Sequence, residues 1–152
     1  MFGKKDQDES AQQPGQGSAA LQAEVARLEA LPLAEVAVEV MTKGFGSGGR
    51  GADDEQITVS GQNVDSGPDV SGIADRFVPE INRWRGRGPG DEALWNQLDR
   101  LVAEGVQQLE LAALVRAQLH SASGSLDFAA TRLGRSALES GTVERILGRG
   151  TA

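Results

Sequence analysis

The sequence of 152 residues contains no cysteine, no tyrosine and a single histidine, and aromatic residues make up only 4% of it. The absence of cysteine excludes disulfide scaffolds, thiolate zinc sites, iron–sulfur clusters and cysteine nucleophiles. One histidine leaves no second imidazole for a multi-histidine metal site. We therefore expect neither a bound metal nor a cofactor.

Long hydrophobic runs are also missing, and no stretch approaches the ~18 apolar residues that indicate a membrane span. The basic start, residues 1–6, is not followed by the apolar segment of a secretory signal. We expect a cytoplasmic protein that does not enter a membrane.

Charge is unevenly distributed along the chain. The formal net charge is −7, from 15 Lys plus Arg against 22 Asp plus Glu. Residues 1–75 hold five basic and thirteen acidic side chains, whereas residues 76–152 hold ten arginines and nine acids. An anionic chain repels nucleic acid unless a local basic patch overcomes its field. The excess of acid therefore lies in the N-terminal half.

The first part of the chain predicts a tail followed by two helices. Residues 1–19 are rich in Gln, Gly, Ser and charge, cannot bury enough apolar surface to fold, and are expected to be disordered. Apolar residues then recur at helical spacing from Leu21 to Lys43, with Pro32 as a kink or a second helix start. Residues 35–40 also alternate like a strand, which leaves their assignment open.

The middle of the chain alternates loops with short elements. A glycine-rich loop at 43–51 precedes a predicted strand at 56–60. A short helix is expected up to about Val78, with Asp69 or Ser71 as its N-cap. Residues 79–90 are then predicted to form another loop.

The strongest pattern is an apolar helical stripe over residues 91–112, with Asp91 as the expected N-cap. Two strand-like runs, 114–119 and 126–130, follow and predict a hairpin. Two short C-terminal helices are expected after it, capped by Thr131 and Thr142. The expected organisation is a tail at 1–19, a helical extension at 20–31, a folded domain at 32–147 and a C-terminal tail at 148–152.

The order of these elements resembles the winged-helix family. The segments that carry the resemblance are 109–116 (LELAALVR), similar to the helix end that enters the wing, and 130–138 (ATRLGRSAL), similar to the exit from the wing. The resemblance implies an α+β, helix-rich fold with a small three-stranded antiparallel sheet. Its long linker at 79–90 departs from the tight turn of a helix-turn-helix.

In that family the helix at 91–112 would be the recognition helix, with its N-terminal half facing the bases. Asn96, Gln97 and Arg100 are suited to base edges. The same helix, however, has one basic residue against five acidic ones, which opposes DNA. We therefore expect a regulatory or adaptor module that docks onto another protein through the acidic face of this helix or through the N-terminal helix. The candidate docking residues are Glu92, Asp99, Glu104 and Glu110.

The alternative is a transcriptional regulator that binds DNA through an arginine-rich loop and the wing. Guanidinium groups can hold phosphates, and a tryptophan can stack on a base. The candidate contacts are Arg83, Trp84, Arg85 and Arg87 in the loop and Arg116, Arg132 and Arg135 around the wing. A solvated loop whose charges balance nearby acids explains the same cluster.

Enzyme motifs are weak. Residues 44–49 match G-x-G-x-x-G, but a helix is expected before them and a strand after them, the reverse of a dinucleotide site. His120, Ser121, Ser123, Ser125 and Asp127 contain the letters of a Ser-His-Asp site, but they lie together at a hairpin tip open to water. The acidic run 53–55 lacks calcium-loop spacing. We expect a non-enzyme.

A second copy of the chain is another expected partner. Leu21, Val25 and Leu28 form an apolar stripe on the first helix that needs a covering surface. Either the same stripe of a second copy or the chain's own domain can supply it.

Overall fold

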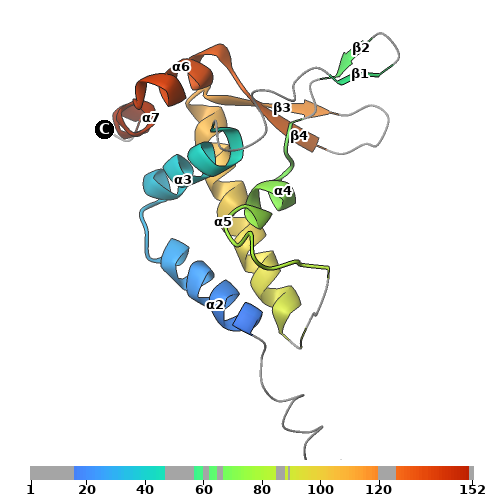
Figure 1. Cartoon of the computed structure of the whole chain (residues 1–152). Coiled ribbons are helices and arrows are strands. Elements are labelled where there is room, and N and C mark those ends of the chain that lie inside the picture. The colour runs from blue at the N-terminus through green and yellow to red at the C-terminus, as the bar shows by residue number, and fades with distance from the viewer. Residues whose placement is uncertain are drawn as a thin grey trace, which may run out of the picture.

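A single long helix, α5 (Asp91–Leu111), is the axis of the fold in the computed structural model of this protein (Figure 1). The structure describes residues 16–46, 57–59, 62–64, 67–84, 88, 90–119 and 126–150. It is an α+β fold dominated by helices. The elements other than α5 are α2 (Gln16–Glu29), α3 (Leu33–Phe45), β1 (Ile57–Val59), β2 (Gln62–Val64), α4 (Val70–Asp75), β3 (Val115–Leu119), β4 (Leu126–Ala130), α6 (Arg132–Ser140) and α7 (Val143–Gly150).

Helices α2, α3 and α4 pack around α5, because the apolar stripe predicted for this helix is buried along its whole length. Five of its members are less than about a twentieth exposed: Trp95, Leu98, Val102, Val106 and Leu109. Leu94, Leu101 and Ala112 are partly buried and pack against this core. The closest approach is to α3, where a Cβ added at Gly105 would lie 2.8 Å from Val40 Cγ2. The lack of a side chain at Gly105 therefore lets α3 and α5 come together.

Helix α2 belongs to this same core. Leu21, Val25 and Leu28 are 1%, 3% and 0% exposed, so the chain's own domain covers the stripe for which a homodimer was considered. The helix begins at Gln16, which shortens the expected tail, and residues 1–15 lie outside the described part. An ion pair also connects α2 to α3: the Arg27 guanidinium donates to both carboxylate oxygens of Glu39, at 2.7 and 2.6 Å.

Residues 35–40, left open between helix and strand by the sequence, are helical and belong to α3. Pro32 is the N-cap of this helix, which agrees with the expectation that it starts a second helix. Val36 and Val40 are buried on one face.

The strands form two separate two-stranded antiparallel sheets, β1 with β2 and β3 with β4. In the hairpin, Val115 is opposite Ala130 and Leu119 is opposite Leu126. The predicted three-stranded sheet is therefore not formed by the described strands, because residues 57–59 pair with 62–64 instead of with the hairpin.

One backbone contact still reaches the outer edge of the hairpin. The Phe128 N–H donates to the Pro68 carbonyl oxygen at 2.9 Å. Proline has no N–H to return a second bond, so the contact is single and does not grow into a strand.

The two C-terminal helices close the end of the fold where α5 enters the hairpin (Figure 1). Thr131 is the N-cap of α6, as predicted, and its hydroxyl accepts from the Gly134 N–H at 3.0 Å. The inner faces of α6 and α7 are buried, through Ala137, Val143 and Leu147. Among the described helices, none is both long and apolar enough to cross a membrane.

Candidate interaction surfaces around helix α5

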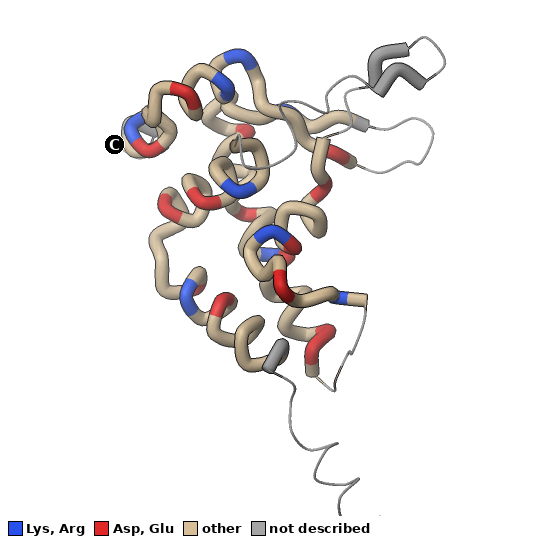
Figure 2. Tube along the Cα trace, viewed as in Figure 1, with Lys and Arg blue, Asp and Glu red and all other residues tan. Residues whose placement is uncertain are grey.

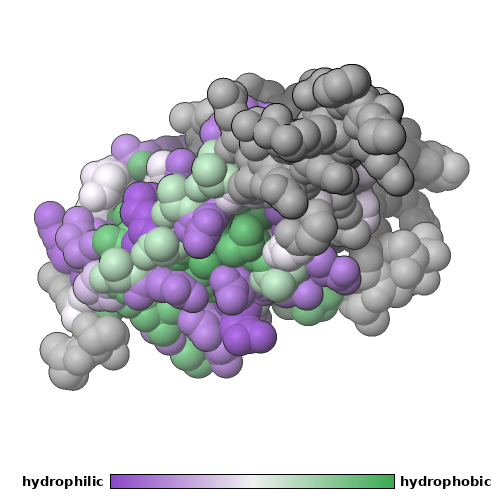
Figure 3. Space-filling view, turned by 90° about the horizontal axis from the view of Figure 1, so that it is seen from below, coloured by the Kyte–Doolittle hydropathy of each residue, from purple (hydrophilic) through white to green (hydrophobic). Residues whose placement is uncertain are grey.

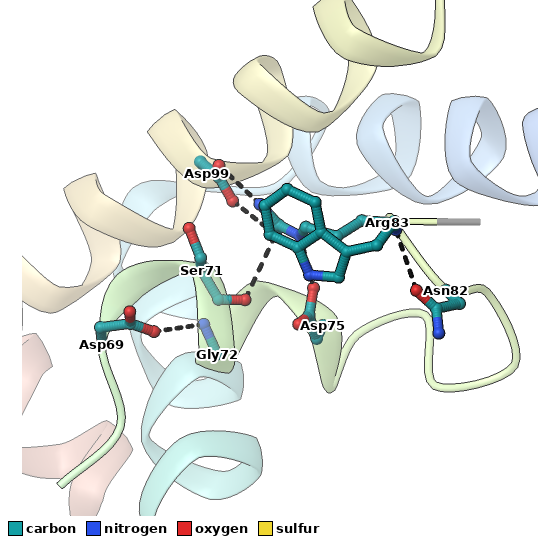
Figure 4. A network of polar contacts seen from close by, with 8 residues as sticks. Asp69, Ser71, Gly72, Asp75, Asn82, Arg83 and Asp99 are labelled. Carbon is teal, nitrogen blue, oxygen red and sulfur yellow. Dashed lines mark hydrogen bonds and ion pairs between the residues drawn. The ribbon is translucent and has the colours of Figure 1, made fainter. Parts of the chain in front are cut away.

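A network of polar contacts is centred on Arg83, in the segment between α4 and α5 (Figure 4). Its Nε donates to Asp75 Oδ1 at 2.7 Å, and its two terminal nitrogens donate to the two Asp99 oxygens at 3.1 and 2.9 Å. A fourth bond, of 3.2 Å, reaches the Ser71 carbonyl oxygen. Arg83 therefore connects α4 directly to α5, and we call these contacts the Arg83 clamp.

The Arg83 guanidinium also lies over the buried indole of Trp95, 4.4 Å from the ring centroid. The residue is only 6% exposed. Burial opposes its charge, but the hydrogen bonds that it donates to Asp99 and Asp75 outweigh that effect and raise the pKa of Arg83 above its ordinary value. The group is permanently cationic and is neutralised inside the fold.

This position changes the interpretation of the arginine-rich loop. Arg83, offered as a phosphate contact, faces the interior and its charge is matched by two carboxylates. Trp84 is 74% exposed, and its backbone N–H donates to Asn82 Oδ1 at 2.9 Å. Arg85 and Arg87 lie outside the described residues.

Two of the five acidic side chains of α5 are also engaged in the fold. Asp91 is 9% exposed, and its carboxylate accepts from the Gly88 N–H at 2.8 Å and from the Ser18 hydroxyl. The N-cap of α5 is Gly90, not Asp91 as predicted, and Gly90 has a left-handed φ of 90°. Asp99 is held in the Arg83 clamp.

The exposed face of α5 is consequently less acidic than the sequence of the helix suggests. Figure 2 marks the charged positions along the chain. Glu92, Glu104 and Glu110 are exposed on it together with one cation, Arg100. Asn96 and Gln97 are exposed on the same face. Three of the four predicted docking residues are thus displayed together, and the fourth, Asp99, is committed to Arg83.

The arginines predicted around the wing lie at the other end of α5. Arg116 is exposed on β3, and Arg132 and Arg135 are exposed on α6. The Thr131 hydroxyl fixes the start of α6 by donating to the Ala113 carbonyl oxygen at 2.6 Å. Twelve or more helical residues, about 20 Å of helix axis, separate this end of α5 from the Arg83 clamp. The predicted nucleic-acid contacts that the structure describes therefore do not lie together on one surface.

Large hydrophobic side chains also reach the surface at several places. On the face viewed in Figure 3, hydrophobic residues appear between hydrophilic ones. The exposed large hydrophobic side chains among the described residues are Leu33 (39%), Trp84 (74%), Leu111 (76%), Leu126 (49%) and Leu133 (48%). They are distributed over separate elements, and Trp84 is the one aromatic residue among them.

The weak enzyme motifs fall mostly outside the described part of the chain. Residues 53–55 and 120–125 are not described. The first two residues of the G-x-G-x-x-G segment are the last two of α3, so a helix leads into it, as expected from the sequence. No group of three or more Asp, Glu or His side chains that could hold a metal occurs within the described residues.

Comparison with models of protein families, with curated proteins and with solved structures found no match to this chain.

Proposed function

We propose that this protein is a non-enzymatic regulatory or adaptor module that docks onto another protein through the exposed face of α5. The observation that carries the proposal is the Arg83 clamp, in which a cation beside α5 faces the interior and binds Asp75 and Asp99. The described residues of that face then present three carboxylates (Glu92, Glu104 and Glu110), three amides (Asn96, Gln97 and Gln107) and one guanidinium (Arg100).

Such a surface suits a protein partner better than a polyanion. If α5 acted as a recognition helix, its carboxylates would repel the phosphates that line a DNA groove. The same carboxylates steer a partner whose surface carries lysine or arginine and help to fix its orientation. The amides add hydrogen bonds that do not depend on the partner's charge.

We also propose a winged-helix-like core. It is supported by the order α3, α4, α5 and hairpin, and by the contact of Pro68 with the edge of β4, the side on which a third strand would lie. The fold alone does not decide between protein docking and DNA binding.

DNA binding remains the second candidate, and a specific observation favours it. Arg116, Arg132 and Arg135 are exposed near the hairpin, where a winged-helix protein would bring its wing to the duplex.

Two experiments separate these functions. The first titrates random-sequence and genomic duplex DNA with the wild type and with an Arg116/Arg132/Arg135→Ala variant, at low and moderate salt. Docking predicts no detectable binding at low salt. Micromolar binding that falls steeply with salt and is lost in the variant would favour the regulator and sink the docking function.

The second experiment measures capture of a cellular partner by a Glu92/Glu104/Glu110→Gln variant. The matched control, Glu29/Glu35/Glu139→Gln, removes three exposed carboxylates from α2, α3 and α6 and so changes the net charge equally. Docking through α5 predicts that the first variant loses a partner that the control retains. Equal capture by both variants would exclude the α5 face.

A further inference from the structure

Two leucines are exposed where the C-terminal end of α5 meets the start of α6. Leu111, the last residue of α5, is 76% exposed, and Leu133, in the first turn of α6, is 48% exposed. A single exposed leucine needs no explanation, but exposed apolar side chains on adjoining segments are typical of an interaction surface.

Backbone contacts hold the two segments that carry these leucines together. The Thr131 hydroxyl donates to the Ala113 carbonyl oxygen at 2.6 Å, and the Thr131 N–H donates to the Leu114 carbonyl oxygen at 3.0 Å. A Cβ at Gly134 would lie 2.0 Å from the same Leu114 oxygen. Each leucine is therefore within two residues of a direct contact between the segments, and the end of α5 lies beside α6 in Figure 1.

Residues 111–116 and 131–136, which we call the corner, contain cations but no acidic residue. The cations are three exposed arginines: Arg116, Arg132 and Arg135. None of these arginines forms an ion pair within the described part of the chain. Exposed acids follow at the margins, with Glu110 before the first segment and Glu139 beyond the second. The positive charge is thus confined to a small area.

Helix stability does not account for these cations. Arg132 is the first residue of α6, and the first turn of this helix contains no acidic residue. A cation at the start of a helix opposes the helix dipole, so a carboxylate would be the stabilising choice there. Departures from such local rules are expected where a residue serves function.

We propose that the corner is a second docking surface, which binds an acidic segment of a partner protein that also carries apolar side chains. Carboxylates of that segment pair with Arg132 and Arg135, because guanidinium and carboxylate groups form paired hydrogen bonds. Its apolar side chains cover Leu111 and Leu133 and remove their surface from water. This surface goes beyond the proposed function, since it needs no partner on the α5 face.

The leucines and the acidic margins favour a short protein segment over a larger polyanion. A sugar–phosphate backbone pairs with arginines but gains little from covering leucine. Glu110 and Glu139 would repel the continuous negative charge of a DNA duplex or an anionic membrane, whereas a short segment fits between them. DNA and an anionic membrane are therefore included as competing occupants in the test.

The main probe is a fluorescent peptide of glutamate, alanine and leucine. Two matched peptides replace its glutamates with lysine or its leucines with alanine. The competing probes are a random-sequence DNA duplex and vesicles of phosphatidylserine and phosphatidylcholine. Each is titrated with the full chain at moderate salt, with anisotropy for the peptides and DNA and sedimentation for the vesicles.

The apolar contact is tested with Leu111→Gln and Leu133→Gln. The control is Leu33→Gln, which replaces an exposed leucine at the start of α3. Each corner variant should weaken binding of the glutamate–leucine peptide by about 3- to 10-fold, and the control should change it by less than about twofold. The peptide without leucine should bind the wild type more weakly by a similar factor.

The charge pairing is tested with Arg132→Gln and Arg135→Gln. Arg100→Gln, on the exposed face of α5, is the control because it changes the net charge equally. Each corner variant should weaken binding of the glutamate–leucine peptide by about 3- to 10-fold, against less than about twofold for the control. Neither corner variant should weaken binding of the lysine peptide. Circular dichroism checks the fold of every variant.

Three results would overturn the proposal. One is no binding of the glutamate–leucine peptide at about 500 µM. Another is binding that the leucine variants or the arginine variants leave unchanged, because both kinds of contact are required. The third is tighter binding of the DNA or the vesicles that is lost in the same variants, which would assign the corner to that occupant.

A Glu92/Glu104/Glu110→Gln variant separates the corner from the docking face on α5. It should bind the glutamate–leucine peptide at least as tightly as the wild type, because repulsion from Glu110 is removed. Weaker binding would place the peptide on the α5 face and overturn the corner. Failure of the corner variants to affect binding leaves the α5 face standing, and failure of the α5 face leaves the corner standing.

Discussion

The guanidinium of Arg83 and the carboxylate of Asp99 meet side by side, with both oxygens of Asp99 bound, at 3.1 and 2.9 Å, across sixteen residues of sequence. A bidentate pair of this kind fixes orientation as well as distance. The packing of α4 on α5 is therefore set by a side chain inside the connection, although that connection is far longer than a helix-turn-helix turn.

Replacing Arg83 should destabilise the whole fold. In Arg83→Gln the clamp loses its charge, and Asp75 and Asp99 remain close together without a counterion. We expect the free energy of unfolding to fall by about 1.5–3 kcal/mol, because charged hydrogen bonds between α4 and α5 are lost, while the two remaining carboxylates are partly exposed and can be solvated. Urea denaturation measures this, with Arg100→Gln on the exposed face of α5 as the control, expected within about 0.5 kcal/mol of wild type. A loss no larger than that of the control would contradict the structural role of the clamp.

Acid should weaken the contact between α2 and α3. The hydrogen bonds from Arg27 lower the pKa of Glu39 in the folded protein. Because the pKa of Glu39 is lower in the folded protein, the ion pair contributes to the free energy of unfolding near neutral pH. This contribution is lost as the pH falls below about 4.5. Because the pair is partly exposed, we expect less than about 1 kcal/mol from it.

The measurement is the free energy of unfolding between neutral and acid pH for the wild type and Glu39→Gln. The difference between them should shrink as the pH falls. Glu35→Gln, which removes an exposed carboxylate of the same helix, is the control. A difference that stays constant with pH would show that the ion pair contributes nothing.

Two glycines in neighbouring helices should respond in opposite directions to the same substitution. A Cβ at Gly134 would lie 2.0 Å from the Leu114 carbonyl oxygen, whereas a Cβ at Gly148 meets nothing within 4 Å. We expect Gly134→Ala to cost about 1–3 kcal/mol or more through overpacking. Gly148→Ala should stabilise α7 by up to about 1 kcal/mol through helix propensity. Thermal melts of both variants decide this, and a stable Gly134→Ala protein would mean that α6 does not approach β3 this closely.

The two tryptophans should be distinguishable by fluorescence. Trp95 is 3% exposed and Trp84 is 74% exposed. Iodide should therefore quench the wild type and Trp95→Phe readily and Trp84→Phe weakly, and the emission of Trp84→Phe should be blue-shifted. Similar quenching of the two variants would contradict the outward position of Trp84.

Elements with strong periodicity or a clear capping residue could be predicted from the sequence. The apolar stripe predicted the C-terminal end of α5 to within one residue. Thr131 and Asp69 are the N-caps of α6 and α4, and both were candidates in the sequence. These features depend on interactions between residues three or four positions apart, which a sequence displays directly.

The polar contacts of Arg83 and Asp91 could not be predicted in this way. The hydrogen-bond partners of Arg83 named above lie 8, 12 and 16 residues away, and the Ser18 partner of Asp91 lies 73 residues away. A run of arginines looks the same whether its first member faces solvent or the interior. The available signal was the presence of acids near the loop, which favours a charge-balanced loop but does not indicate which arginine is buried.

The sheet was mispredicted for a different reason. Residues 56–60 have strand composition, but composition does not specify the pairing partner, and the nearby residues 62–64 offer a hairpin with less loop entropy to lose.

The contact of Pro68 with Phe128 has a consequence for the behaviour of the protein at high concentration. The Phe128 N–H, on the side of β4 that faces away from β3, is bound to the Pro68 carbonyl oxygen. Pro68 itself has no N–H to offer to an incoming strand. An unprotected strand edge is a template for aggregation, and proline on an edge is one of the devices that prevent it. This segment therefore gives the hairpin a barrier against intermolecular sheet growth on the β4 side.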